Sequence, residues 1–306
     1  MRRSLFQPGA RYRPMPELPE VETVVRGLQP AMEGQRIDRV LLRRADLRFP
    51  FPDGFAEHLT GAVITGLSRR AKYALADLNS GWVLVMHLGM SGSFRVAEKE
   101  AGPAPGLFHH ARSKNPAHDH VEIGLMSGAR VIYNDPRRFG YMTLVERRQF
   151  DGHKLFSGMG VEPLGNGLSA DYLARRFAGK SAPLKAVLLD QRIIAGLGNI
   201  YVCEALWRAR LSPTRTAATL TGGRGAQRRI EDLIQSIREI LVEAIESGGS
   251  SLRDHAQTDG SLGYFQHRFA VYDQEGAPCP RPTCDGVVLR FVQSGRSTFY
   301  CPRCQK

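Results

Sequence analysis

Hydrophobic residues recur along the chain with distinct spacings that predict where its elements lie. Between Pro19 and Gly34 they return every three or four positions and acids occupy the first turn, which predicts an amphipathic helix. Short runs rich in Val, Ile, Leu and Tyr follow, with turn sequences such as Asn79-Ser80-Gly81 between them, and these predict antiparallel strands. The runs span roughly 36–43, 62–69, 72–78, 82–87, 93–96, 120–126, 129–134 and 141–145. Strands at this density indicate a β-sandwich.

The spacing of hydrophobic residues becomes helical after a Gly-containing linker at 158–167. Ser169 is placed to cap a helix that runs to Phe177. Further helical patterns cover 184–190, 199–208 and 224–246. The second half of the chain is therefore predicted to form a helical domain. A stretch at 97–117, rich in Gly, Pro, Ala and Lys, shows no pattern and is expected to be a mobile insertion.

The charge of the chain favours a polyanionic partner. Its 306 residues carry a net charge of +12 and a pI near 9.8. The first fourteen residues hold four of these arginines and no acid, so +8 remains on the rest. We interpret residues 1–14 as a disordered extension or a translation-start artefact. A generally basic, solvated surface is the alternative explanation of the charge. Apolar runs are far shorter than the roughly 20 residues of a membrane helix, so no membrane span is expected.

Four of the five cysteines crowd into the last 28 residues. The spacing Cys279-x4-Cys284-x16-Cys301-x2-Cys304 places two thiol pairs on two turns, with a predicted hairpin (287–291 and 297–300) between them. Four thiolates match the tetrahedral coordination of zinc, and protein ligands would fill every position, so we expect one structural Zn²⁺. Disulfide pairing is the alternative. No secretory segment precedes the fold, which favours reduced thiols.

Seven motifs together resemble those of formamidopyrimidine-DNA glycosylases, in the same order. They are MPELPEVETVVRGL at 15–28, RRAKY at 69–73, HLGMSGS at 87–93, DPRRFG at 135–140, GLGNIYVCEALW at 196–207, TDGSLGYF at 258–265 and the four-cysteine finger. The resemblance implies an α+β, multidomain fold: an N-terminal β-sandwich with flanking helices, a helix-two-turns-helix domain and a C-terminal zinc finger. It also implies double-stranded DNA with oxidised bases or abasic sites as the partner.

The resemblance assigns each part of the chain a place in this architecture. We expect a basic extension (1–15), a catalytic β-sandwich (16–147), a linker (148–162), the helix-two-turns-helix domain (163–266) and the finger (267–306). The implied activity is a bifunctional glycosylase and abasic-site lyase that removes 8-oxoguanine and formamidopyrimidines and cleaves the strand by β- and δ-elimination. A monomer is expected, located in the cytoplasm and associated with the nucleoid when bound to DNA.

The resemblance places the catalytic chemistry on Pro16, Glu17, Lys72 and Arg296. A proline at a chain terminus has a secondary amine, which is a good nucleophile when neutral. Glu17 is expected to move protons at the sugar, Lys72 to assist elimination and contact phosphate, and Arg296 to aid δ-elimination. Taken alone, a Pro-Glu pair before a helix also fits an ordinary helix start.

Six further residues are expected to contact DNA. An enzyme that extracts a base must fill the hole and hold the widowed partner base. The resemblance assigns this task to Met90, Arg137 and Phe139, although core packing is an alternative for Met90 and Phe139. It assigns phosphate contacts to His118, Asn199 and Lys180, and Asn199 could equally be a simple helix cap.

A lid over the extracted base is expected from Ser250 to Tyr264, with Arg253 where a lysine is common. Two features depart from the family pattern. The first cysteine pair is separated by four residues where two are usual. In addition, Met15 and residues 1–14 precede Pro16, and a proline inside a peptide bond has no free amine.

Two alternatives to this function remain at the level of sequence. One is an endonuclease VIII-like glycosylase for oxidised pyrimidines, although that branch has PEGPE where this chain has PELPE. The other is a non-catalytic DNA-binding relative with a blocked terminus. The residues Glu17 and Lys72 favour an enzyme, since binding alone does not require them.

Overall fold

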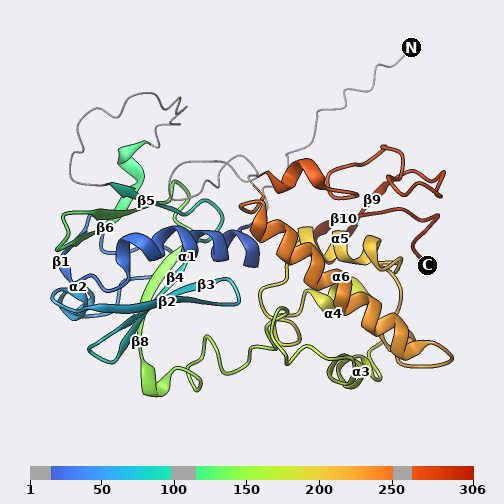
Figure 1. Cartoon of the computed structure of the whole chain (residues 1–306), viewed down its shortest axis with the longest axis horizontal. Coiled ribbons are helices and arrows are strands. Elements are labelled where there is room, and N and C mark those ends of the chain that lie inside the picture. The colour runs from blue at the N-terminus through green and yellow to red at the C-terminus, as the bar shows by residue number, and fades with distance from the viewer. Residues whose placement is uncertain (1–14, 98–114, 251–263) are drawn as a thin grey trace, which may run out of the picture.

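The computed structural model describes residues 15–97, 115–250 and 264–306. It has two halves, one built of strands and one of helices with a small hairpin at the C-terminal end (Figure 1). The predicted N-terminal extension, most of the predicted insertion at 97–117, and Arg253 lie outside the described residues. No helix in the described ranges is both long and apolar enough to cross a membrane.

The strand-rich half is a sandwich of two four-stranded antiparallel sheets, which confirms the predicted fold. The first sheet has the order β1 (Ile37–Leu42), β6 (Asp119–Leu125), β7 (Arg130–Asn134), β5 (Ser93–Ala97). The second has the order β2 (Ile64–Arg70), β3 (Tyr73–Leu78), β4 (Trp82–His87), β8 (Tyr141–Glu146). Their inner faces bury Val, Ile, Leu and aromatic side chains in one cluster. The eight predicted strands are all present.

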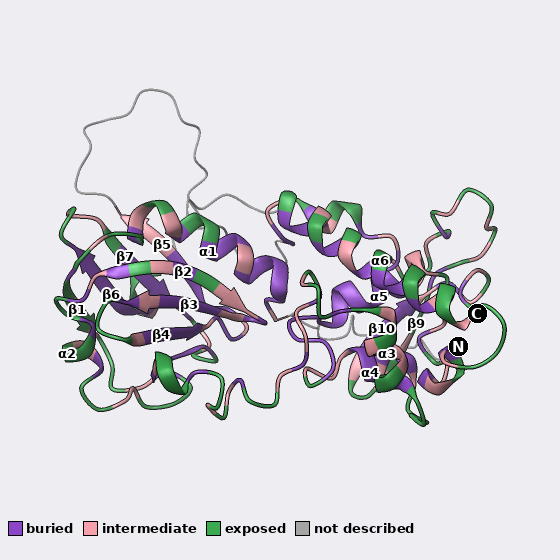
Figure 2. Cartoon of the chain, turned by 60° about the horizontal axis from the view of Figure 1, so that its bottom comes forward, coloured by how far each residue is buried: buried purple, intermediate pink, exposed green. Residues whose placement is uncertain are grey.

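Helix α1 (Leu18–Met32) joins the two halves. Its Val24, Val25 and Leu28 pack into the sandwich core, as the helical spacing predicts. Its first residue, Leu18, belongs instead to the core of the helical half. Figure 2 shows that the end of α1 nearest the helical half is buried. The residues just before α1 are thereby held where the two halves meet.

The helical half is organised around α5 (Asn199–Arg208), which is almost completely buried and packs on α6 (Ala226–Glu246). Ser169 Oγ accepts a hydrogen bond from Tyr172 N at 3.2 Å, which confirms the predicted cap. The other α-helices of this half are α3 (Ala170–Phe177) and α4 (Leu184–Leu188). Short 3₁₀ turns occur throughout the described chain, at η1 (Pro116–His118), η2 (Arg147–Gln149), η3 (Ala217–Leu220) and η4 (Phe265–Arg268).

Two elements differ from the prediction. One helix was not predicted, and one strand of the C-terminal hairpin begins later in the sequence than predicted. Helix α2 (Phe55–Leu59) has only five residues, too few to show a helical period. The C-terminal hairpin consists of β9 (Leu289–Gln293) and β10 (Arg296–Tyr300), so β9 begins two residues later than predicted. Phe299 of this hairpin is buried in the same core as α5. The hairpin therefore packs against the helical half.

Candidate active site

The carboxylate of Glu17 lies at the N-terminal end of helix α5, on the opposite half of the molecule. Its Oε1 accepts a hydrogen bond from the backbone N–H of Ile200 at 3.0 Å. Gly198 makes this approach possible, because a Cβ there would lie 2.1 Å from Glu17 Cδ. Free N–H groups at a helix N-terminus attract an anion. Helix α5 therefore fixes Glu17, and with it the adjacent Pro16.

Burial makes Glu17 a weak acid. Its side chain is 3% exposed, and desolvation raises its pKa to about 7, with a further upward contribution from Glu20. The Lys72 ammonium and the α5 amides oppose this rise without cancelling it. Its second oxygen, Oε2, is buried without a hydrogen-bond partner among the described residues. A carboxyl with these properties can donate and accept a proton near neutral pH.

The carboxylate of Glu20 has a structural role. It accepts hydrogen bonds from the Glu17 backbone N–H at 2.8 Å and from the Tyr201 hydroxyl at 2.6 Å. It also accepts from the backbone N–H of Ser250 at 2.9 Å and from the Ser250 hydroxyl at 2.8 Å. Through these hydrogen bonds, Glu20 connects the start of α1 with α5 and with Ser250.

Lys72 projects from the tight turn between β2 and β3. Arg70 pairs with Tyr73 across this turn, and Ala71 adopts a positive φ of 53°. The turn is tied to the inter-half linker because Glu162 accepts from the Ala71 backbone N–H at 2.7 Å and from Arg70 at 2.7 Å. Lys72 itself is 8% exposed. Desolvation lowers its pKa, and the negative charge of Glu17 partly offsets this effect.

A cavity of about 410 Å³ opens beside these groups. Met15, Lys72 and Arg296 line it, so the residue preceding Pro16 is at its wall. Arg296 also depresses the pKa of Lys72 by charge repulsion, which places the two cations near each other. The structure therefore brings together the residues around Pro16, Glu17, Lys72 and Arg296, which the family resemblance assigns to one reaction centre.

Strand β10, which begins with Arg296, is held by two buried polar side chains. The fully buried Lys185 donates to the Ser297 carbonyl at 3.2 Å and to Thr298 Oγ1 at 2.7 Å. Asn199 Nδ2 donates to the same Ser297 carbonyl at 3.0 Å. Asn199 was predicted to grip a phosphate, and in this structure its amide positions β10. Lys185 was not singled out from the sequence, since a lysine in a short amphipathic pattern has no distinguishing signal.

The three residues predicted to fill the gap in DNA lie on two adjoining loops. Met90 is in the turn between β4 and β5, and it is half-buried. Arg137 and Phe139 lie between β7 and β8, with the Arg137 guanidinium carbon 4.7 Å from the Phe139 ring centroid. Phe139 is 42% exposed, an unusual exposure for a phenylalanine. This exposure argues against core packing as the role of Phe139.

The two remaining predicted phosphate contacts lie in different places. His118 ends η1, and its carbonyl accepts from the backbone N–H of Asp135 at 3.0 Å, so it adjoins the Arg137 loop. Lys180 is exposed beyond the end of α3. Hydrogen bonds from Arg192 are the main cause of the lowered pKa of Asp190, and the positive charge of Lys180 adds to this effect. Two basic side chains of the cavity were not predicted from the sequence: Lys154 and Arg192. Neither sits in a motif with a recognisable spacing.

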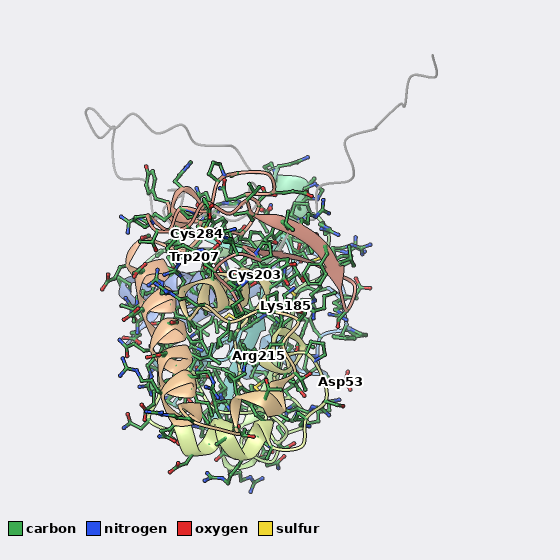
Figure 3. All side chains as sticks on the ribbon, turned by 90° about the vertical axis from the view of Figure 1, so that its right-hand side faces the viewer. Asp53, Lys185, Cys203, Trp207, Arg215 and Cys284 are labelled. Carbon is green, nitrogen blue, oxygen red and sulfur yellow. The ribbon has the colours of Figure 1, made fainter. Side chains whose placement is uncertain are left out.

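The four C-terminal cysteines converge as predicted. Their Sγ atoms all lie within 4.8 Å of one another, which suits four thiolate ligands on one ion. A Cβ on Gly286 would lie 2.7 Å from Cys301 Sγ, so the glycine makes room for the cluster. Trp207 of α5 donates from Nε1 to Cys279 Sγ at 3.4 Å. In the view of Figure 3, Trp207 and Cys284 lie above Cys203 and Lys185.

The cluster fits a structural zinc ion. The sulfur atoms come from two turns that bracket the β9–β10 hairpin, and protein ligands can fill all four coordination positions. No position remains for a substrate. A bound Zn²⁺ would fix the base of the hairpin that carries Arg296 and would take no part in bond making or breaking.

Three protein-family models match successive parts of the chain. The formamidopyrimidine-DNA glycosylase N-terminal domain matches residues 15–142. The formamidopyrimidine-DNA glycosylase H2TH domain matches residues 159–256, and the zinc finger found in FPG and IleRS matches residues 276–306. These segments correspond to the sandwich, the helices and the cysteine hairpin.

Whole proteins and solved structures give the same result. Formamidopyrimidine-DNA glycosylases of Rhodopseudomonas palustris (strain BisA53) and Agrobacterium fabrum are 64% and 63% identical, each over 95% of this chain and 100% of the relative. The crystal structure of the MutM (Fpg) protein from Thermus thermophilus is 40% identical with a TM-score of 0.77, covering 95% of this chain and 98% of that one. Lactococcus lactis Fpg in a complex with abasic-site DNA is 32% identical with a TM-score of 0.79, covering 95% and 100%.

Proposed function

The chain belongs to the formamidopyrimidine-DNA glycosylase family, and we propose that Pro16 is the nucleophile with which it removes oxidised purines from DNA. The observation that carries this proposal is the position of Glu17. Helix α5 holds this carboxyl in a buried site beside Lys72, and Pro16 precedes it directly in the chain.

The reaction begins at the sugar of the damaged nucleotide. The neutral amine of Pro16 attacks the anomeric carbon, the bond to the base breaks, and the base leaves with a proton. The proline nitrogen then loses its proton, the bond between the anomeric carbon and the ring oxygen breaks, and the ring oxygen takes up a proton, which opens the sugar and leaves an iminium. This iminium withdraws electrons, so the neighbouring sugar proton becomes acidic. Loss of that proton expels the 3′ phosphate, and a second elimination expels the 5′ phosphate. A single covalent intermediate thus serves both base removal and strand cleavage.

Three side chains support this chemistry. Glu17, with a pKa of about 7, is suited to deliver a proton to the opening sugar and to take one back. Lys72, whose pKa is lowered by burial, can accept the proton that elimination releases. Arg296 lines the same cavity, where its guanidinium can stabilise the departing phosphate.

The proposal requires that Pro16 be the first residue of the active protein. An amide nitrogen has no lone pair available for attack, so Met15 and everything before it must be absent. The match to the family begins at Met15, and the relatives align over their whole length with 95% of this chain. Removal of an initiating methionine at position 15 would leave Pro16 as the terminus.

The partner and setting follow from charge and from the completeness of the site. The net charge of +12 suits the phosphate backbone of double-stranded DNA. Glu17, Lys72 and Arg296 all come from one chain, so we propose that a monomer is the active form. We further propose that it acts in the cytoplasm on nucleoid DNA.

Borohydride trapping tests the role of Pro16. Borohydride reduces an iminium and links the enzyme to DNA permanently. Protein that begins at Pro16 should be trapped on duplexes with 8-oxoguanine opposite cytosine, and protein that begins at Met1 should not. Equal trapping of both forms would show that a free Pro16 is unnecessary. Peptide mapping of the trapped product identifies the attached residue.

A substrate panel and a substitution separate the remaining alternatives. Preference for thymine glycol over 8-oxoguanine would indicate an oxidised-pyrimidine specificity. A Pro16→Gly protein that nicks DNA as well as the wild type would argue against proline chemistry. Binding of lesion DNA without any nicking by the Pro16 form would indicate a non-catalytic relative.

A further inference from the structure

We propose that Asp135 is a positioning residue that locks the Met90 loop and the Arg137 loop into one unit, and that this unit sets the preference for the base opposite the lesion. The inference rests on the proposed function and on the family resemblance, which assigns Arg137 to the widowed base. It adds a residue that touches neither DNA nor the sugar.

Asp135 is the most enclosed carboxylate of this region, with 0% exposure. Its Oδ2 accepts from the Gly140 backbone N–H at 2.8 Å and from the Tyr133 hydroxyl at 3.2 Å. Its Oδ1 accepts from the Ser91 hydroxyl and from the Arg137 backbone N–H at 3.3 Å. One buried side chain therefore binds both ends of the Arg137 loop and also the residue that follows Met90.

Ser91 completes the connection between the two loops. Its Oγ donates to Asp135 Oδ1 and accepts from the Arg137 backbone N–H at 3.2 Å. Ser91 is 6% exposed, so water does not compete strongly for these bonds. The hydroxyl bridges the loop that carries Met90 and the loop that carries Arg137.

The backbones of the two loops also lie in direct contact. Gly89 has a φ of +64°, and a Cβ on it would lie 2.3 Å from the carbonyl carbon of Phe139 and 2.3 Å from Gly140 N. Met90 is thus fixed on one side by the packing of Gly89 and on the other by the hydrogen bonds of Ser91. Neither loop can shift without breaking contacts made by the other.

This arrangement bears on function because the two loops have to act together. Removing a base leaves a gap that Met90 must fill while Arg137 and Phe139 hold the opposite strand. A loop that is free to move would lose conformational entropy at each encounter with DNA and would aim the Arg137 fork less accurately. With Asp135 in place, the two loops become ordered when the protein folds. The buried hydrogen bonds then offset the conformational entropy that the loops lose.

The inference is tested with protein that begins at Pro16 and carries Ser91→Ala, with Asp135→Asn as a second variant. Single-turnover rates are measured on 8-oxoguanine opposite cytosine, on 8-oxoguanine opposite adenine, and on a preformed abasic site. Ser91→Ala should slow excision opposite cytosine by about tenfold, the equivalent of one buried hydrogen bond to a charged group. Excision opposite adenine should fall less, so that the preference for cytosine drops by about threefold or more.

Cleavage at a preformed abasic site should stay within about twofold of the wild type, because no base has to be extracted there. Two controls identify a merely structural effect. Tyr133→Phe removes a bond to the same carboxylate that does not join the two loops, so it should change the preference for cytosine less than Ser91→Ala does. Ser236→Ala removes a buried hydroxyl that bonds locally to Asp232 in α6 and should behave as the wild type.

Three results would overturn the inference: an unchanged preference in Ser91→Ala, an equal loss on the abasic site, or the same change of preference in Tyr133→Phe. Asp135→Asn should reproduce the loss of preference more strongly if it folds, and its melting temperature shows whether it does. A wild-type protein that excises nothing would overturn the proposed function, whereas an active wild type with unaltered variants would overturn this inference alone.

Discussion

Glu17 and Gly198 touch across the boundary between the two halves of the molecule. A side chain at position 198 would put its Cβ 2.1 Å from Glu17 Cδ and 2.4 Å from both carboxylate oxygens. Cβ atoms in folded proteins do not approach other heavy atoms so closely. The absence of a side chain at 198 is therefore what lets helix α5 bind Glu17 through the Ile200 N–H.

Gly198→Ala should displace Glu17 and reduce base excision by about a hundredfold or more, the usual contribution of a general acid. The free energy of unfolding should fall by about 1–3 kcal/mol, as for other overpacked sites. Single-turnover excision and chemical denaturation measure the two effects. Gly222→Ala is the matched control, because a Cβ there meets nothing within 4 Å. Full activity of Gly198→Ala would show that Glu17 need not sit at α5.

Stability should depend on pH through Glu17. Its pKa is raised from 4.5 to about 7 in the folded protein, so the folded state keeps a proton that the unfolded state loses. This contribution is complete below pH 4.5 and is lost as the pH rises through 7, at a total cost on the order of 3 kcal/mol.

The matching variant is Glu17→Gln, which keeps the size of the side chain and cannot ionise. Urea unfolding at pH 5 and pH 8 should show the wild type losing more stability than Glu17→Gln across this interval. The exposed Glu57→Gln should follow the wild type. Parallel loss of stability in wild type and Glu17→Gln would mean that Glu17 titrates normally.

Much of the fold could be predicted because it is encoded locally. The strand runs, the Ser169 cap and the helix at Asn199–Arg208 each follow from neighbouring residues, and the cysteine spacing predicted the metal cluster. Helix α2 was missed because five residues give no period. Local patterns of this kind determine elements, but they do not determine which elements meet.

The environment of the site was less predictable because it depends on distant contacts. Glu17 and Ile200 are 183 positions apart, and no spacing in the sequence connects them. The family motifs assign Asn199 a phosphate contact, and they give no sign that its amide also binds the Ser297 carbonyl, almost a hundred positions away. Asp135 lies in the DPRRFG motif, but only the three-dimensional structure shows that it contacts both loops.

Loss of zinc should disable DNA binding by releasing the hairpin that bears Arg296. Cys301 is fully buried in the cluster, so Cys301→Ser should reduce the zinc content, weaken DNA affinity and lower borohydride trapping. Dialysis against a chelator should have the same effect. Cys203→Ala, a buried cysteine outside the cluster, should retain zinc. Unchanged DNA affinity of zinc-free protein would show that the finger folds and binds without metal.

Lys154 offers a test of the cavity as a phosphate site. It lines the cavity with Lys72 and Arg296, and it is exposed. If its ammonium neutralises one DNA phosphate, Lys154→Ala should reduce the slope of log affinity against log salt by about 0.9. Binding should weaken for every sequence alike, since a phosphate contact carries no base information.

The measurement uses a duplex with a stable abasic-site analogue, so that cleavage does not interfere, at several salt concentrations. Arg228→Ala is the control: Arg228 is exposed on α6, pairs with Asp232, and lies on no wall of the cavity. Its removal should leave the slope unchanged. Equal slopes for Lys154→Ala and the wild type would exclude Lys154 as a phosphate contact. The cationic character of the cavity would then rest on Lys72, Arg192 and Arg296, of which Arg192 is already paired with Asp190.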